Sequence, residues 1–201
     1  MTAAKGKRLT IPFLVGVIAL LAGALSGIYW LRPPDFRLAT LPPGPALADF
    51  HLLDYDGRAH SLADYRGRVL VIFFGYVHCP DVCPAELFKL AQVMKRLGSA
   101  SDRVQVLFIT LDPERDTPAL LKSYVTAFDP HFIGLTGTVS QIDKVAAGFY
   151  VAHAKVPVGN DYGIDHSAAT YILDARGNRR LLGELSTRID DFAHDLEILA
   201  R

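Results

Sequence analysis

The longest apolar run in the chain lies close to its N-terminus. No charged residue interrupts the stretch from Leu9 to Leu31. As a helix with a rise of 1.5 Å per residue it would be roughly 30 Å long, enough to cross a bilayer. Basic residues precede the run and aromatic residues stand near its end, as at a membrane interface. The pattern predicts a cytoplasmic N-terminus over residues 1–9 and a transmembrane helix over residues 10–31.

A cleavable secretory signal is the alternative for the same run, because its small residues AGALSG would suit a signal peptidase. The run is long for a signal peptide and continues past these residues, which favours the anchor. Under either interpretation, we expect the rest of the chain to be exported from the cytoplasm. We expect a single-pass protein of a bacterial inner membrane with its domain in the periplasm. Proline-rich residues 32–46 suit a semi-rigid linker and leave residues 47–201 as one domain.

Short apolar runs alternate with amphipathic stretches through this domain. Continuous apolar runs at 68–76 and 103–112 are typical of strands buried on both faces. After each run the apolar spacing changes to the three- and four-residue intervals of a helix, over 84–98 and from Thr117 onward. The remaining pattern predicts a hairpin over 49–62 with its turn at Asp56–Gly57, a helix over 139–148, a strand over 150–155, a hairpin over 169–185 with its turn at Gly177–Asn178, and a final helix over 188–200.

The order of these elements indicates a fold class. Strand, helix, strand, helix predicts a parallel βαβ core. The two cysteines of the chain lie directly after the first buried strand, at the entrance to the following helix. We therefore predict an α/β fold, a thioredoxin-like domain in which a central mixed sheet is flanked by helices, preceded by one N-terminal transmembrane helix.

Charge excludes one class of partner. The chain has 21 Lys and Arg residues against 21 Asp and Glu residues, a formal net charge of zero. It has no basic run beyond the short N-terminal segment that precedes the apolar run. The electrostatic footprint of a nucleic-acid-binding protein is therefore missing, and we exclude nucleic acid as a partner.

The cysteines occur in the sequence HCPDVCP, as Cys79 and Cys83. Pro84 suits the first position of the following helix, which predicts Cys83 as the N-cap and Glu86 as the residue that satisfies a free amide at the third position. Cys79 then lies in the preceding loop. Both sulfurs would feel the positive end of the helix dipole, which favours the thiolate that attacks disulfides or binds metals. This placement leaves both chemistries open.

Ligand number separates the two chemistries in part. Two thiolates suit a soft ion such as Cu(I) or Zn(II), but two cysteines alone cannot form a closed sulfur site within one molecule. A third ligand must be nitrogen or oxygen. Among the seven histidines, we select His166, because its sequence context DYGIDHSAATYIL predicts a turn-rich loop that leads into a strand at the edge of the sheet.

Three segments resemble, in order and spacing, the SCO/SenC family of cytochrome c oxidase assembly proteins. They contain the sequences FFGYVHCPDVCPAEL, LFITLDPERDTPALL and DYGIDHSAATYILD. The resemblance implies a copper-binding, thioredoxin-like protein that delivers copper, as Cu(I) or Cu(II), to the binuclear site of oxidase subunit II. It implies an upstream copper donor as a further partner. The family's ligands match Cys79, Cys83 and His166, and Asp112 matches an acidic position that we assign to support of the ligands or to partner docking.

Other functions stay open at the level of sequence. A thiol-disulfide oxidoreductase that reduces the cysteines of the same partner, or of other exported proteins, would need Cys79 and Cys83 but not His166. We expect no classical enzyme beyond such reductase activity. A peroxidase and a purely structural disulfide rank lower, the latter because it would close only a short loop. The four charges of DPERD suit a solvated turn.

Overall fold

The computed structural model of the protein describes residues 15–21, 23, 34–42 and 49–201. These residues belong to two separate units, one that ends at Asp35 and one that extends from Phe36 to Arg201. Residues 15–21 and 23 are helical. Within the described ranges, no helix combines the length and the apolar character that a membrane crossing requires. The predicted N-terminus over 1–9 and most of the predicted span over 10–31 lie outside the described residues, so both stay predictions.

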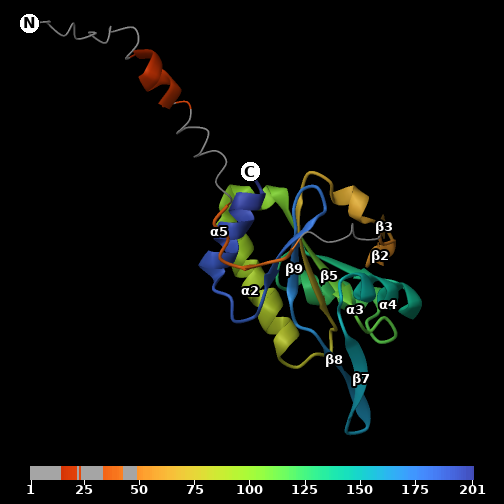
Figure 1. The fold of residues 1–201 in the computed structure, drawn as a ribbon. Helices are drawn as coiled ribbons and strands as arrows, with labels where there is room; N and C mark the ends of the chain where they lie inside the picture. The colour runs from red at the N-terminus through yellow and green to blue at the C-terminus, as the bar shows by residue number, and fades with distance from the viewer. Residues whose placement is uncertain (1–14, 22, 24–33, 43–48) are drawn as a thin grey trace, which may run out of the picture. The chain divides into compact units, whose positions relative to one another are not determined.

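The larger unit is built on an eight-stranded mixed sheet (Figure 1). Its centre consists of three parallel strands, β4 (Val69–Gly75), β5 (Val104–Thr110) and β6 (Ile133–Thr136). Both β4 and β5 are buried along their full length, as their continuous apolar sequences predict. Antiparallel strands extend the sheet on both sides in the order β1 (Ala39–Thr40), β10 (Arg179–Gly183), β9 (Thr170–Leu173), β4, β5, β6, β2 (Leu52–Asp54), β3 (Ala59–His60).

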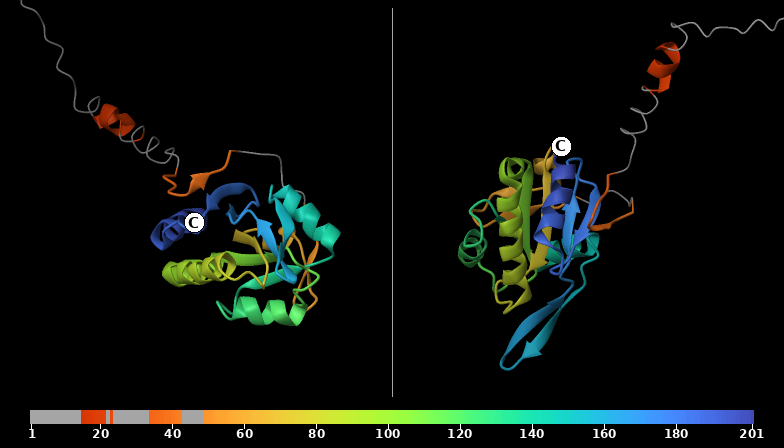
Figure 2. Two further views of the ribbon diagram at one scale, coloured as in Figure 1. Left: turned by 90° about the horizontal axis from the view of Figure 1, so that it is seen from below. Right: turned by 90° about the vertical axis from the view of Figure 1, so that its left-hand side faces the viewer.

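Helices cover both faces of the sheet (Figure 2). The helices α2 (Val82–Leu97), α3 (Pro118–Thr126) and α5 (Ile189–Leu199) lie on one face, and α4 (Val139–Gly148) lies on the other. Two short 3-10 helices, η1 (Leu62–Tyr65) and η2 (Gly98–Arg103), complete the connections. The parallel βαβ core and the central mixed sheet flanked by helices are therefore confirmed.

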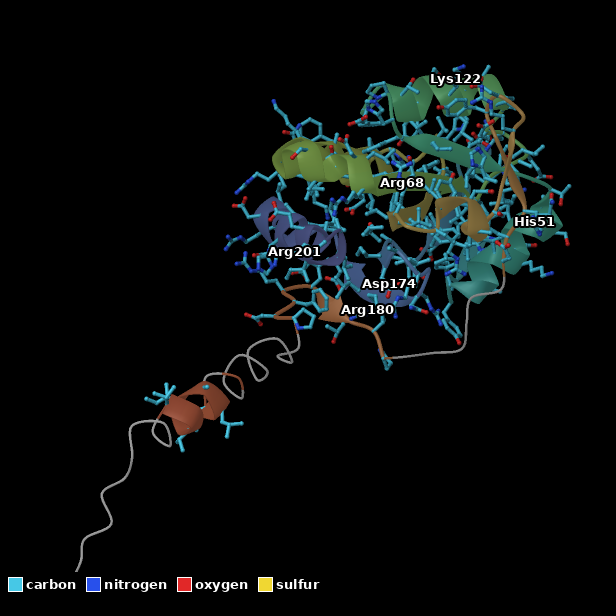
Figure 3. All side chains as sticks on the ribbon, turned by 90° about the horizontal axis from the view of Figure 1, so that it is seen from above. His51, Arg68, Lys122, Asp174, Arg180 and Arg201 are labelled. Atoms are coloured by element: carbon cyan, nitrogen blue, oxygen red, sulfur yellow. The ribbon has the colours of Figure 1, made fainter. Side chains whose placement is uncertain are left out.

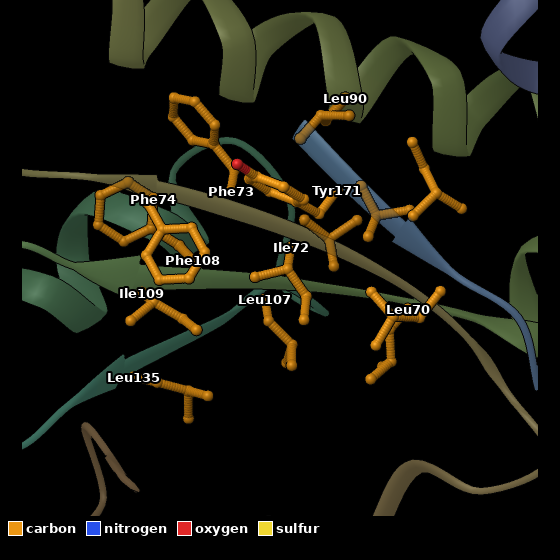
Figure 4. Packing of buried hydrophobic residues seen from close by; sticks show 14 of the residues in the cluster. Leu70, Ile72, Phe73, Phe74, Leu90, Leu107, Phe108, Ile109, Leu135 and Tyr171 are labelled. Carbon is orange, nitrogen blue, oxygen red and sulfur yellow. The ribbon is translucent and has the colours of Figure 1, made fainter. Parts of the chain in front are cut away.

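The core forms where these layers meet. Neighbouring residues of β4 point to opposite faces, so the Phe73 ring lies near Phe108 on the α2 side, whereas the Phe74 ring packs 5.4 Å from that of Phe149 after α4. Leu90 reaches from α2 toward the sheet (Figure 4). Charged side chains such as Lys122 stand on the outside of the domain (Figure 3).

Most elements lie where the pattern predicts them. The hairpins at Asp56–Gly57 and Gly177–Asn178 form, as do the helices α3, α4 and α5. Thr117 caps α3 by accepting a hydrogen bond from the Leu120 amide. The first turn of α2 differs from the prediction. Asp81 is the N-cap and the helix begins at Val82, so Cys83 and Pro84 are its second and third residues.

The structure places part of the predicted linker on the domain. Strand β1 pairs with β10, and the buried carboxylate of Asp195 on α5 accepts hydrogen bonds from the backbone amides of Arg37 (2.9 Å) and Leu38 (2.8 Å). Phe36 is consequently the first residue of the compact unit, whereas the sequence pattern places the domain boundary at residue 47.

A second, two-stranded sheet projects from one end of the domain (Figure 1). Its strands are β7 (His153–Val158) and β8 (Asp161–His166). The strand predicted over 150–155 begins later, because Tyr150 takes a left-handed conformation (φ 60°) that ends α4. His166, which the sequence places in a loop, is the last residue of β8 and pairs with His153.

Candidate metal centre

Three segments meet at one end of the central sheet. The carboxyl ends of parallel β4 and β5 share this edge, and the Leu111 amide donates to the Gly75 carbonyl across it (2.7 Å). Strand β9 is antiparallel to β4 and pairs Thr170 with Phe73, so its amino end lies at the same edge. The cysteine loop, the loop after β5 and the end of β8 are therefore brought together by strand topology.

The two cysteines occupy the start of α2. Cys79 lies in the loop, half-buried, with its amide bonded to the Tyr76 carbonyl (3.2 Å). Its sulfur accepts a hydrogen bond from the Cys83 amide (3.5 Å), one of the amides that a helix start leaves without an intrahelical partner. Both cysteines are free thiols. The Cys79 sulfur is thus directed onto the start of the helix.

Cys83 is completely buried. A Cβ atom at Gly75 would lie only 2.8 Å from its sulfur, so the absence of a side chain in β4 makes the space that the thiol fills. Burial raises the pKa of the Cys83 thiol, chiefly by desolvation. The expectation that the helix dipole makes both sulfurs acidic therefore does not hold for Cys83, because desolvation is the larger effect.

His166 faces the Cys83 sulfur. Its Nε2 atom lies 3.7 Å from Sγ of Cys83, and its Nδ1 atom lies 3.0 Å from the Ser167 carbonyl oxygen. A carbonyl oxygen only accepts, so Nδ1 carries the proton and Nε2 presents its lone pair to the sulfur. The imidazole stands edge-on to the rings of Phe73 and Tyr76. Burial lowers the pKa of His166 and keeps the ring neutral, the form that binds metals.

The spacing of this pair fits a shared metal ion. The bond lengths of zinc, about 2.3 Å to sulfur and 2.05 Å to nitrogen, place two ligands of one such ion roughly 3.5–3.8 Å apart. Cys83 and His166 have this separation. Within the described residues, no group of three or more Cys, His, Asp or Glu side chains is arranged to hold a metal. The structure therefore assembles two of the three predicted ligands, and Cys79 would have to turn from the Cys83 amide to join them.

Glu86 does not satisfy a helix amide, as the sequence suggested. It is buried, forms an ion pair with Lys89 (2.8 Å) and accepts a hydrogen bond from the Thr170 hydroxyl (2.7 Å). Lys89 in turn donates to the Glu184 carbonyl (2.5 Å). These contacts fasten α2 to β9 and to the segment before α5.

The DPERD loop is not the solvated turn that its charges suggest. Asp112 and Asp116 are each only 1% exposed. Asp112 binds the Arg115 guanidinium (2.5 Å) and the Tyr162 hydroxyl (2.9 Å), so its carboxylate is not available to dock a partner. Asp116 accepts from the Val77 amide (3.1 Å), two residues before Cys79. Burial raises the pKa of Asp116 by desolvation.

Sequence reasoning missed the roles of Asp116, Arg115 and Tyr162. Asp116 lies 3.6 Å from the His78 ring. Tyr162 lies on β8, whose Asp and Gly residues make its sequence unlike that of a typical strand. The available signal was the density of charge directly after a buried strand, at the edge where the cysteines lie.

Comparisons with known proteins agree with this architecture. A family model described as SCO1/SenC matches residues 39–201. The mitochondrial protein SCO2 homolog of Bos taurus is 41% identical over 180 residues, which cover 85% of this chain and 66% of that protein. The SCO2-like protein of Rickettsia felis is 37% identical over 180 residues, which cover 84% of each chain. The chain spans only 50% of the length of the human SCO2 homolog.

Solved structures share the fold. Bradyrhizobium japonicum ScoI, solved with copper bound, is 40% identical and superimposes with a TM-score of 0.72 over 77% of this chain and 99% of that one. The apo form of Sco1 from Thermus thermophilus is 34% identical, with a TM-score of 0.73 over 82% of this chain and 96% of that one. The predicted thioredoxin-like α/β fold is thereby confirmed.

Proposed function

The chain belongs to the SCO1/SenC family, and on that premise we propose that it binds copper through Cys79, Cys83 and His166. The observation that carries the proposal is the pair formed by the Cys83 sulfur and Nε2 of His166, 3.7 Å apart, with the second nitrogen of the ring bonded to the Ser167 carbonyl. Thiolate and imidazole are ligands that copper favours.

The third ligand requires a local change. Cys79 lies in the loop before α2, four residues before Cys83, and its sulfur accepts a weak hydrogen bond from the Cys83 amide. Rotation of this half-buried side chain toward the Cys83–His166 pair would complete an S₂N set. Three ligands leave the coordination shell open, so that an incoming ligand can join before an old one leaves. Such a site suits a protein that transfers copper better than one that stores it.

We propose delivery as the function of this carrier. Copper bound here is cargo, received from an upstream donor and passed to the binuclear copper site of cytochrome c oxidase subunit II. The support is family membership, together with the copper-bound structure of the similar protein ScoI. A periplasmic location and an N-terminal membrane anchor are part of the same proposal. They would hold the domain, with Cys79 and Cys83, on the side of the membrane from which it can reach the oxidase.

The test is an anaerobic Cu(I) titration of the reduced full chain in detergent, against a competing chelator. We expect one copper per chain. In His166→Ala and in Cys83→Ser the affinity should fall more than about 100-fold, since loss of an outer hydrogen-bond partner of a ligand alone costs about 10–100-fold. Arg176→Ala is the matched control, because Arg176 is exposed in the turn after β9, at the opposite end of the sheet.

An unchanged affinity in His166→Ala would contradict the three-ligand site. The dithiol would then act chiefly as a redox pair, the oxidoreductase alternative. Burial raises the pKa of Cys83, and only the thiolate attacks a disulfide, so Cys83 is poorly suited to be the attacking residue of an oxidoreductase. Half-buried Cys79 would have to be the attacking residue, and Cys79→Ser should then abolish disulfide reduction while His166→Ala leaves it intact.

A further inference from the structure

We propose that Arg115 is a positioning residue for the copper site, which holds the β7–β8 hairpin, and with it His166, in place relative to the cysteine loop. This inference rests on the proposed copper-binding function. It gives a role to the DPERD motif, whose charges the ligand set does not use. The loop that carries this motif contacts both halves of the site, the cysteine loop on one side and the β7–β8 hairpin on the other.

The first side of the loop is joined to the cysteine loop. The Thr110 hydroxyl accepts from the Asp112 amide (2.9 Å) and donates to the Asp116 carboxylate (2.5 Å), which closes the loop on itself. The same carboxylate oxygen of Asp116 accepts from the Val77 amide (3.1 Å). Because Asp116 is buried, these bonds are shielded from water, and the path from β5 to the residues before Cys79 is short and fixed.

The second side of the loop is joined to the hairpin through Arg115. Its guanidinium binds Asp112 (2.5 Å), Asp161 (2.9 Å) and the Tyr162 carbonyl (2.9 Å), and it lies 3.5 Å over the Tyr162 ring. The Tyr162 hydroxyl donates back to Asp112 (2.9 Å). The planar fork of arginine can bridge two carboxylates and stack on a ring at once, whereas a lysine ammonium cannot. Arg115, Asp112 and Tyr162 therefore form a closed clamp.

The clamp matters because strand pairing does not orient the hairpin. Strands β7 and β8 pair with each other in a sheet separate from the eight-stranded one. Side-chain contacts and the short link from His166 to β9 therefore set the angle of β8 relative to β4 and α2. The clamp grips the first two residues of β8, and His166 is the last residue of the same short strand. A change of angle at Asp161 and Tyr162 displaces the imidazole from the Cys83 sulfur.

The test is a double-mutant cycle on Cu(I) affinity in the full chain. We expect Arg115→Ala to weaken binding about 10–100-fold, the usual cost of losing a group that orients a ligand. In the His166→Ala background, Arg115→Ala should cause no further loss, because the residue acts only through His166. The Cu(I) affinity of Arg115→Lys should lie between those of the wild type and Arg115→Ala, because lysine keeps the positive charge but lacks the planar guanidinium. Arg96→Ala, which removes an exposed ion pair with Asp190, is the control and should leave affinity unchanged.

A copper-free measurement tests the positioning independently. In Arg115→Ala, amide hydrogen exchange should accelerate in β7 and β8 and stay unchanged in β4 and β5, and the ring resonances of His166 should shift. Equal losses of affinity with and without His166 would overturn the inference, as would unchanged exchange in the hairpin. If the wild-type chain binds no Cu(I), the proposed function fails, while the exchange and ring measurements still decide the role of Arg115.

Discussion

Gly75 shows how a residue without a side chain shapes the site. It is the last residue of β4 and lies directly beneath the start of α2. A Cβ atom there would meet the Cys83 sulfur at 2.8 Å and the Phe108 ring at 2.9 Å, and both partners are completely buried. Neither can move without disturbing the core, because protein interiors are close-packed.

We expect Gly75→Ala to lower the free energy of unfolding by about 1–3 kcal/mol, the usual cost of overpacking a core, and to weaken copper binding by displacing the Cys83 thiol. Urea unfolding and Cu(I) titration measure the two effects. Gly148→Ala is the matched control, because a Cβ at this helical position meets nothing within 4 Å, and it should be neutral or stabilising by up to about 1 kcal/mol. Equal behaviour of the two variants would refute the steric argument.

At the level of single residues, the sequence predicts Cys79, Cys83 and His166 as ligands, and the structure brings Cys83 and His166 together. The predicted start of α2 was wrong by two residues. The first amides of a helix have no intrahelical partner, so a proline is tolerated at any of the first three positions and not only at the first. The Ala85 amide makes the first bond of α2, to the Asp81 carbonyl (3.2 Å). Pro84 at the third position therefore loses nothing, and the sequence signal could not distinguish the two registers.

At the level of elements, the strongly apolar strands were predictable and the hairpin was not. Strands β4 and β5 are long apolar runs whose burial follows from composition. Strand β8 has the sequence DYGIDH, which is rich in residues that disfavour strands. It forms because β7 pairs with it over its full length and because Arg115 holds Asp161 and Tyr162. Such tertiary contacts leave no periodic signal in the sequence.

The attachment of β1 is also tertiary, and it leads to a prediction. Asp195→Ala leaves the amides of Arg37 and Leu38 without their acceptor, and we expect the free energy of unfolding to fall by about 1–3 kcal/mol. Glu197→Ala, in the same helix, removes a carboxylate that accepts no hydrogen bond within the described part of the chain and should change stability by less than about 0.5 kcal/mol. Hydrogen exchange at Leu38 should accelerate only in the Asp195 variant. Unchanged exchange there would show that β1 is held by strand pairing alone.

At the level of the whole molecule, the proposed copper site links parts of the chain that are distant in sequence. Cys83 and His166 are 83 residues apart, and they belong to a helix on the main sheet and to the separate hairpin. A metal ion bound to both would connect two substructures that share no strand pairing. Bound copper should therefore stabilise the folded state of the whole domain.

We expect Cu(I) in excess over the chain to raise the melting temperature of the reduced protein. A ligand at 100 times its Kd stabilises the folded state by about 2.7 kcal/mol, which corresponds to roughly 5–10 °C for a domain of this size. Because unfolded thiols also bind Cu(I), the comparison that matters is with His166→Ala, which keeps both cysteines but loses the link to the hairpin. Its shift should be much smaller, and a Cu(I) chelator should reverse the wild-type shift. Equal shifts in the two proteins would mean that copper binds the cysteine loop alone, and that the hairpin takes no part in holding it.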